Sequence, residues 1–158
     1  MNAKKLSLII IITVIAVALL IVGSAAAKAS ESTFNCSNNE EYETTDPGSW
    51  SFPDGNIHIR GMKQTARVVC DDTRLIGYND ITVNANWDAN FTGPMWGKFT
   101  FRSDEGGIFK GTWNGMMTAD GSWYNAVGNG SGEYEGLKLW IDKEIDQTTG
   151  RILNPMGD

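Results

Sequence analysis

The chain has 158 residues with 13 basic and 19 acidic side chains, which gives a net charge of −6 at pH 7. This length suits one domain and hardly two. An acidic surface repels phosphate backbones, so nucleic acid is disfavoured as a partner. The chain also has one histidine and two cysteines, without the spacing of a metal site, so zinc is disfavoured and no cofactor is indicated.

Residues 1–29 have the layout of an export signal, and we expect them to form a signal or anchor helix. Lys4 and Lys5 precede an apolar run over 6–22, and alanines near residues 25–29 provide two possible cleavage sites. An uncleaved anchor is the alternative, because a run of about 17 residues lies at the lower limit for a membrane span. A lipoprotein is disfavoured, because the residues before Cys36 are not the small and apolar ones that lipidation requires. We expect a secreted or extracytoplasmic protein, with membrane contact through this segment alone if it stays attached.

Removal of residues 1–29 would take away three lysines and no acid. It would leave 10 basic residues against 19 acidic ones, a net charge of −9. Such an acidic surface favours solubility.

Residues 30–55 form a polar stretch, which predicts a mobile leader before a domain over 56–158. Cys36 is its one expected tether. An even cysteine count in an exported chain predicts a disulfide between Cys36 and Cys70. The closed loop of about 34 residues would contribute roughly 3–4 kcal/mol to stability. A reactive thiol is the alternative, but no activating pattern accompanies either cysteine.

From residue 56 onward, apolar residues alternate with period two, and no helical period of useful length occurs. Turn signals at Asp71-Asp72, 103–107 and Asp120-Gly121 separate the alternating segments. The pattern predicts strands over 56–70, 74–78, 81–87, 96–102, 108–117, 122–128 and 131–141.

Glycines occur repeatedly inside these strand patterns. Glycine normally weakens a strand, but it permits the kinks and close approaches that a curved sheet needs. We therefore expect a small antiparallel β-barrel of six to eight strands, because closure also removes exposed sheet edges. The glycines concerned are Gly97, Gly111, Gly115, Gly128, Gly132 and Gly136.

The alternation also assigns faces. Phe99, Phe101, Phe109 and Trp113 share faces with glycines and are expected to point inward, since alternating small and large residues fill a narrow barrel. Their neighbours Lys98, Thr100, Lys110 and Asn114 are expected to point outward. If the glycines leave unfilled volume beside Trp113, the interior holds a pocket; if neighbouring side chains fill it, there is only a core.

Three segments, 96–99, 106–115 and 128–137, share a texture of glycine and tryptophan. Together they resemble the allene oxide cyclase-like barrels, which are similar in architecture to dirigent proteins and other calycin-shaped barrels. The resemblance covers roughly residues 56–155. It implies the fold, and because no residue matches the catalytic positions of that family, it implies no site.

Several residues have a chemical interpretation and a structural alternative. His58 is the one possible base of a catalytic triad, but it is expected to be a surface or structural residue. Glu133 and Glu135 lie two apart and form a possible acid/base pair, or an ordinary solvated one. Asp71-Asp72 and Asp104-Glu105 are possible calcium ligands, or turn residues. The glycine run over 128–132 resembles a phosphate loop, but no helix follows it.

The aromatic residues are many for so short a domain. Core packing is the simpler explanation for most of them. The alternative is an interior or mouth that binds a small apolar or aromatic molecule. The candidate ligand-binding residues are Trp87, Trp96, Trp113, Trp123, Tyr124 and Tyr134.

Three functions remain open. The favoured one is an exported barrel that binds a small apolar or aromatic ligand without catalysis. The second is an enzyme of the cyclase or isomerase type, with an apolar interior and one acidic group. The third is a structural module at the cell surface, which a solidly filled barrel would favour. The sequence does not indicate an oligomeric state.

Overall fold

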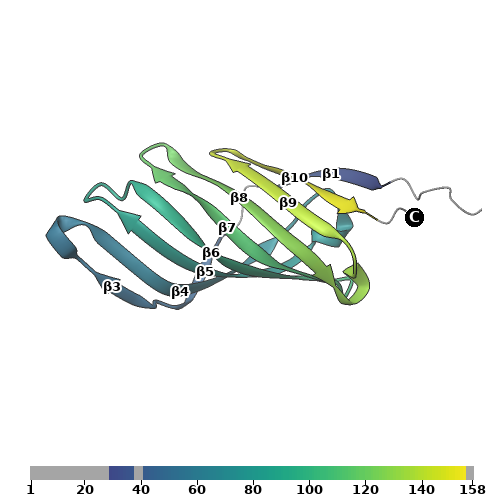
Figure 1. Cartoon of the computed structure of the whole chain (residues 1–158), viewed down its shortest axis with the longest axis horizontal. Helices are drawn as coiled ribbons and strands as arrows, with labels where there is room; N and C mark the ends of the chain where they lie inside the picture. The colour runs from purple at the N-terminus through teal and green to yellow at the C-terminus, as the bar shows by residue number, and fades with distance from the viewer. Residues whose placement is uncertain (1–28, 38–40, 156–158) are drawn as a thin grey trace, which may run out of the picture.

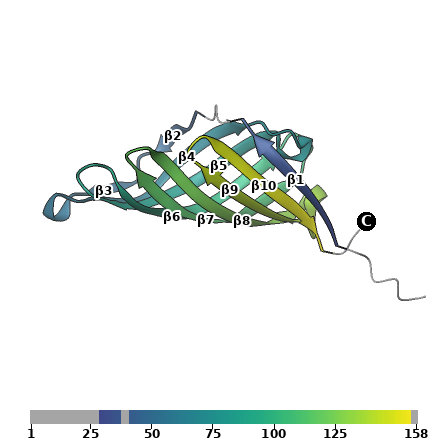
Figure 2. The same ribbon diagram turned by 90° about the horizontal axis from the view of Figure 1, so that it is seen from above.

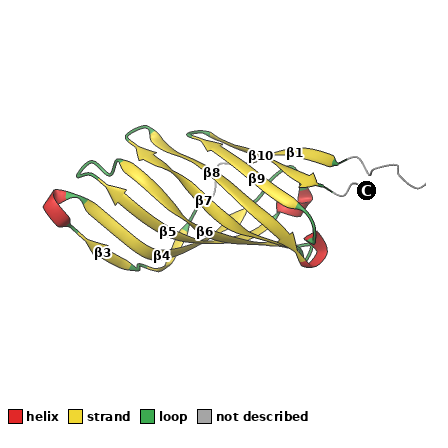
Figure 3. Cartoon of the chain, in the orientation of Figure 1, coloured by secondary structure: helices red, strands yellow, loops and turns green. Residues whose placement is uncertain are grey.

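The computed structural model describes residues 29–37 and 41–155, which form one antiparallel sheet of ten strands (Figures 1 and 3). These residues contain no α-helix and three short 3₁₀ turns, η1 (Pro53–Gly55), η2 (Thr73–Leu75) and η3 (Gly132–Tyr134). The strands are β1 (Ser30–Cys36), β2 (Glu43–Asp46), β3 (Ser49–Ser51), β4 (Ile57–Val68), β5 (Gly77–Trp87), β6 (Gly93–Ser103), β7 (Ile108–Thr118), β8 (Gly121–Ser131), β9 (Lys138–Glu144) and β10 (Gln147–Asn154).

From β4 to β10 each strand pairs with the next one along the chain, and β1 joins the far edge beside β10. At the other edge, β2 and β3 both pair with β4. Figure 2 shows that the sheet curls around its own interior. The all-β, antiparallel prediction is confirmed, with ten strands in place of the six to eight expected.

The two edges of the curled sheet meet at one place. Cys36 at the end of β1 forms an isolated antiparallel bridge with Cys70, just beyond β4. The Ser37 N–H donates to the Val69 carbonyl, and the Asp71 N–H donates to the Asn35 carbonyl, each at 3.0 Å. Elsewhere in the described residues no strand ladder joins the edges, so the pairing does not close the sheet.

A disulfide links Cys36 to Cys70, as predicted, and their Cα atoms lie 3.9 Å apart. It holds the N-terminal strand against the end of β4, the tether expected of Cys36. A bond of this kind is typical of an oxidising, extracytoplasmic compartment.

The polar stretch over 30–55 differs from the expected mobile leader, because it contributes β1, β2 and β3 to the sheet. Backbone hydrogen bonds to β10 and β4 form these strands, and polar side chains facing solvent do not prevent such pairing. The predicted N-terminal helix lies outside the described residues. Within them, no helix is long and apolar enough to cross a membrane.

Two of the predicted strands are wrong in extent. The segment 74–78 begins in η2, and only its end joins β5, which runs on through the predicted strand at 81–87. The segment 131–141 begins at the last residue of β8 and continues into η3, and β9 starts only at Lys138. Gly132 and Gly136 have φ values of +65° and +84°, a left-handed backbone that glycine permits. They serve a turn, and not a curved strand.

The predicted faces of β6 and β7 are confirmed. Phe99, Phe101, Phe109 and Trp113 are all buried, with Phe109 fully so, whereas Lys98, Lys110 and Asn114 are exposed and Thr100 is half-buried. Glycine gives these rings room. A Cβ at Gly97 would lie 1.6 Å from the Thr82 carbonyl oxygen and 2.8 Å from Trp113 Nε1.

Large side chains fill one part of the interior almost completely. We call this part the packed region, formed by Phe34, Val68, Leu75, Phe101, Phe109, Tyr134, Leu139 and Ile152. The rings of Phe109 and Tyr134 lie 5.0 Å apart. The space left beside Phe34, Phe101 and Leu139 is about 30 Å³, room for about one water molecule. This half of the interior is therefore a solid core.

Candidate functional site

The other part of the interior holds a cavity of about 320 Å³ that is open to solvent on one side. Apolar side chains make up most of its wall, and they come from β4 to β9. This volume lies at the lower end of the usual range for small-molecule sites, about 300–1,000 Å³. The apolar lining consists of Met62, Ile81, Val83, Trp87, Met95, Phe99, Trp113, Met117, Ala126 and Ile141.

The polar part of the wall consists of Tyr42, Gln64, Asn79, Ser122 and Tyr124. None of the lining residues is aspartate, glutamate, lysine, arginine or histidine. A charged molecule would lose its hydration here without gaining an opposite charge, which is costly in an apolar site. The cavity therefore suits uncharged molecules.

The alternation of β5 places four lining residues on one face. Asn79, Ile81, Val83 and Trp87 are separated by even numbers of residues, so they all point inward. The cavity extends to Trp87 at the end of this strand, beside the hairpin that leads to β6.

An irregularity in β4 turns its lining residues inward. The pairing of β4 with β5 shifts between Ile59 and Met62, and Gly61 has a φ of +70° at that point. The Asn84 side-chain oxygen accepts a hydrogen bond from the Gly61 N–H at 3.1 Å. A one-residue shift reverses the faces of a strand, so Met62 and Gln64 point to the same interior side as Ile59, which precedes the bulge and is buried. Met62 and Gln64 line the cavity.

The structure divides the six aromatic residues that the sequence nominated. Trp87, Trp113 and Tyr124 line the cavity, and the rings of Trp113 and Tyr124 lie 5.9 Å apart. Trp96 and Trp123 are exposed and do not line it. Tyr134 is buried in the packed region. Whether any of them binds a ligand stays a prediction.

Other nominated residues lie away from the cavity. The side chain of His58 lies on one face of β4, and the buried side chains of Ile57 and Ile59 lie on the other. Glu133 and Glu135 do not share a strand face, because Glu133 belongs to η3 and Glu135 follows it, and both are exposed. The glycine run over 128–132 spans the end of β8 and the start of η3.

The acidic turn residues are engaged by protein donors. The Asp71 carboxylate accepts hydrogen bonds from the backbone and side-chain amides of Asn35, and Asp104 pairs with Arg67 at 2.5 Å. The hydrogen bond from the Asn35 backbone N–H is the main reason that the pKa of Asp71 lies below its usual value, and the one from the Asn35 side chain adds to it. Within residues 29–37 and 41–155, no group of three or more histidine, cysteine or acidic side chains has metal-binding geometry.

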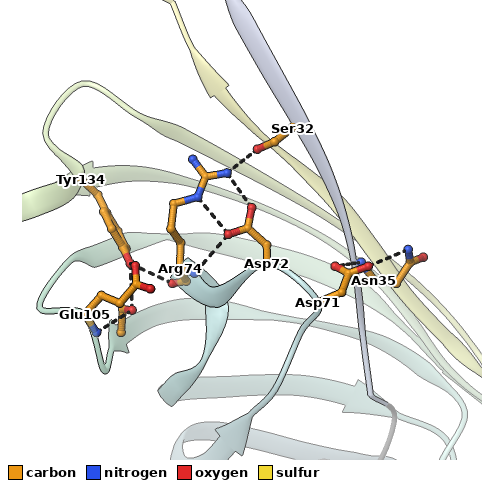
Figure 4. Close-up of polar contacts among 8 residues, drawn as sticks. Ser32, Asn35, Asp71, Asp72, Arg74, Glu105 and Tyr134 are labelled. Carbon is orange, nitrogen blue, oxygen red and sulfur yellow. Dashed lines mark hydrogen bonds and ion pairs between the residues drawn. The ribbon is translucent and has the colours of Figure 1, made fainter. Parts of the chain in front are cut away.

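A polar cluster covers the packed region near the meeting point of the sheet edges (Figure 4). The guanidinium of Arg74 donates to both carboxylate oxygens of Asp72 and to the hydroxyl of Ser32 on β1. The hydrogen bond from Arg74 lowers the pKa of Asp72, against the opposing effect of burial. The cluster therefore ties β1 to the turn before β5, as the nearby disulfide does.

Tyr134 joins the same cluster from the other side (Figure 4). Its hydroxyl donates to the Arg74 carbonyl at 3.1 Å and lies 2.8 Å from the Ser103 hydroxyl. Burial raises the pKa of this phenol, so it stays neutral at physiological pH. Its contacts are those of a structural residue.

Sequence reasoning missed much of the cavity wall. Met62, Met95 and Met117 carry no distinctive motif, and Tyr42 belongs to the stretch expected to be mobile. Asn79 and Gln64 are polar residues on inward faces. The period-two pattern of β5 could have identified Asn79, because it shares the parity of Ile81 and Val83.

Comparison of the chain with protein-family models, with curated proteins and with solved structures finds no match.

Proposed function

We propose that this protein is an exported β-barrel that binds a small, uncharged and largely apolar molecule in its interior, without catalysis. The observation that carries the proposal is the cavity of about 320 Å³, walled mainly by aliphatic, methionine and aromatic side chains. Burial of apolar ligand surface is the main driving force for binding in such a site. The volume suits a ligand of about ten to fifteen non-hydrogen atoms.

The curled sheet with meeting edges supports the barrel part of the proposal, and the disulfide supports export. Three methionines in the wall favour a site that adapts to its ligand, because their flexible side chains repack easily. A solid interior would have favoured a structural module, and the cavity weighs against it.

An enzyme of the cyclase or isomerase type has less support. Proton transfer in an apolar interior needs a positioned acid or base, most often histidine or a carboxylate. The lining residues include neither. Tyr42 and Tyr124 are the ionisable side chains in the wall.

The test uses 1-aminonaphthalene, an uncharged fluorophore small enough for this volume, whose emission shifts to the blue in apolar surroundings. We expect saturable binding to the purified protein. Ala126→Leu adds three carbon atoms inside the cavity and should weaken binding by about five- to 150-fold, because overpacking costs about 1–3 kcal/mol. Val127→Leu, at the neighbouring exposed position, is the matched control. No saturable binding, or equal binding by both variants, would overturn the proposal.

A further inference from the structure

In the part of the chain that the structure describes, three buried side-chain polar atoms have no hydrogen-bond partner. They are Asn79 Oδ1, Trp87 Nε1 and Trp113 Nε1. All three residues line the same cavity. Native structures leave few buried donors or acceptors unpaired, because each loses its hydration without compensation. Their concentration around one apolar space indicates that the missing partners come from the ligand.

The surrounding structure holds each of these side chains in place. The Trp113 ring lies over Gly97, where a Cβ would come within 2.8 Å of Nε1, and its side is covered by Tyr124. The Trp87 ring packs at 6.1 Å from Phe91 of the adjoining hairpin. The Asn79 amide nitrogen donates to the Tyr42 hydroxyl at 3.5 Å, which leaves its oxygen without a partner.

The chemistry of the unpaired atoms is asymmetric. An indole nitrogen only donates, so both tryptophans require an acceptor, whereas the Asn79 oxygen requires a donor. Nothing charged lines the cavity. The acceptor that fits is therefore a neutral oxygen, such as that of a ketone, an ester or an ether, and not a carboxylate or a phosphate.

Strand spacing limits how many of these atoms one ligand can reach. Val83 is level with Trp113 across β6, since both pair with Gly97. It lies midway between Asn79 and Trp87 on β5, with about 13 Å of strand on either side. A ligand of about ten to fifteen atoms therefore reaches Trp113 and one of its neighbours, and not all three.

We propose that the ligand is an uncharged apolar molecule with a neutral acceptor oxygen, and that the indole N–H of Trp87 or of Trp113 recognises this oxygen. The inference rests on the proposed function and adds the polar group by which the site selects among apolar molecules. Hydrogen bonds made inside an apolar site select strongly, because an analogue without the acceptor leaves the donor unpaired.

The test compares two probes of the same shape, 2-acetylnaphthalene and 2-isopropenylnaphthalene, in which C=CH₂ replaces C=O. The quantity measured is the ratio of their dissociation constants. Solvation of the ketone in water is the same for every protein variant, so it cancels when ratios are compared. We expect Trp87→Phe with Trp113→Phe to shift the ratio against the ketone by about three- to tenfold. Trp96→Phe, on the exposed face, should leave the ratio unchanged.

A second measurement needs no substitution. In ¹⁵N-labelled protein, the ketone should move an indole N–H resonance of Trp87 or Trp113 downfield, and the hydrocarbon should not. This measurement decides the question if the double variant does not unfold cooperatively.

The outcomes separate the two proposals. If both probes bind and neither the ratio nor the indole resonances respond to the ketone, the acceptor inference is wrong while the proposed function stands. If neither probe binds, both fall.

Discussion

The packed region and the cavity lie on the same interior face and share several strands, yet one leaves about 30 Å³ empty and the other about 320 Å³. In the packed region large rings lie against glycine: Phe34 against Gly150, and Tyr134 against Gly107. Around the cavity, Ala126 and Ser122 are too short to reach across, and no larger neighbour compensates. Rings lie against glycine at the cavity wall too, where Trp113 lies against Gly97 and Phe99 against Gly128. The empty volume therefore follows from the short side chains of Ala126 and Ser122, and not from a lack of such pairs.

The largest expected contrast is in the cost of truncation. Phe109→Ala removes a fully buried ring from the packed region and should lower the free energy of unfolding by about 3–5 kcal/mol. Met117→Ala removes a half-buried side chain that already borders empty space, and should cost about 1 kcal/mol or less. Urea unfolding of both variants measures the two values. Equal losses would mean that the cavity wall is packed as tightly as the core.

The disulfide should stabilise the packed region more than the cavity wall. Replacing Cys36 and Cys70 together by serine removes the link between the sheet edges and should cost about 3–4 kcal/mol. Amide hydrogen exchange should speed up most in β1 and β10, which pair with one another. A uniform increase across β5 to β8 would contradict this localisation.

A third prediction concerns substitutions that add side-chain atoms to the interior, and not ones that remove them. Ala126→Leu projects into the cavity and should change stability by less than about 1 kcal/mol. Ala66→Leu makes the same change at a buried residue outside the cavity wall and should cost about 1–3 kcal/mol. Thermal unfolding of the two variants compares them directly. A larger loss for Ala126→Leu would show that the cavity cannot accept added atoms.

The smallest expected effect concerns pH and the polar cluster over the packed region. The pKa of Asp72 is lower in the folded protein than in the unfolded chain, because Arg74 donates to its carboxylate. Its contribution to stability is therefore present above about pH 5 and is lost as pH falls below about 4.

Asp72→Asn should thus destabilise the protein at pH 7, and its difference from wild type should shrink towards pH 3. Asp120→Asn, in an exposed hairpin, is the control and should show no such convergence. A difference that stays constant with pH would mean that packing, and not charge, carries the effect.

The regular strands were predictable from their alternation, because side-chain parity alone sets which face is buried. This alternation predicts the inward rings of β6 and β7. The even number of cysteines predicts the disulfide. The edge strands were not predictable in the same way. The side chains of β1, β2 and β3 are mostly polar and exposed, and these segments are strands only because the backbones of β10 and β4 pair with them.

The cavity itself depends on distances between residues far apart in the chain. Three of the six nominated aromatics line it, and the other three carry equally suggestive sequence contexts. Alternation along the strands separates these aromatic residues in part, because residues an even number of positions apart share a face. Trp113 shares the face of the buried Phe109, whereas Trp96 shares the face of the exposed Lys98. The bulge at Gly61 reverses parity within β4, so no fixed alternation could have placed both Ile59 and Met62 inside.

The pairing of β1 with β10 has a practical consequence for handling the protein. Ser30 lies opposite Asn154, so the two ends of the described fold leave from the same edge (Figure 1). The cavity reaches Trp87 and Met117, beside the β5–β6 and β7–β8 hairpins on the opposite side of the sheet. A tag or tether joined directly before Ser30 or after Asn154 would therefore hold the molecule by one end and leave the hairpins around the cavity facing outward. Immobilised protein should retain its full capacity for small molecules in a flow-cell measurement.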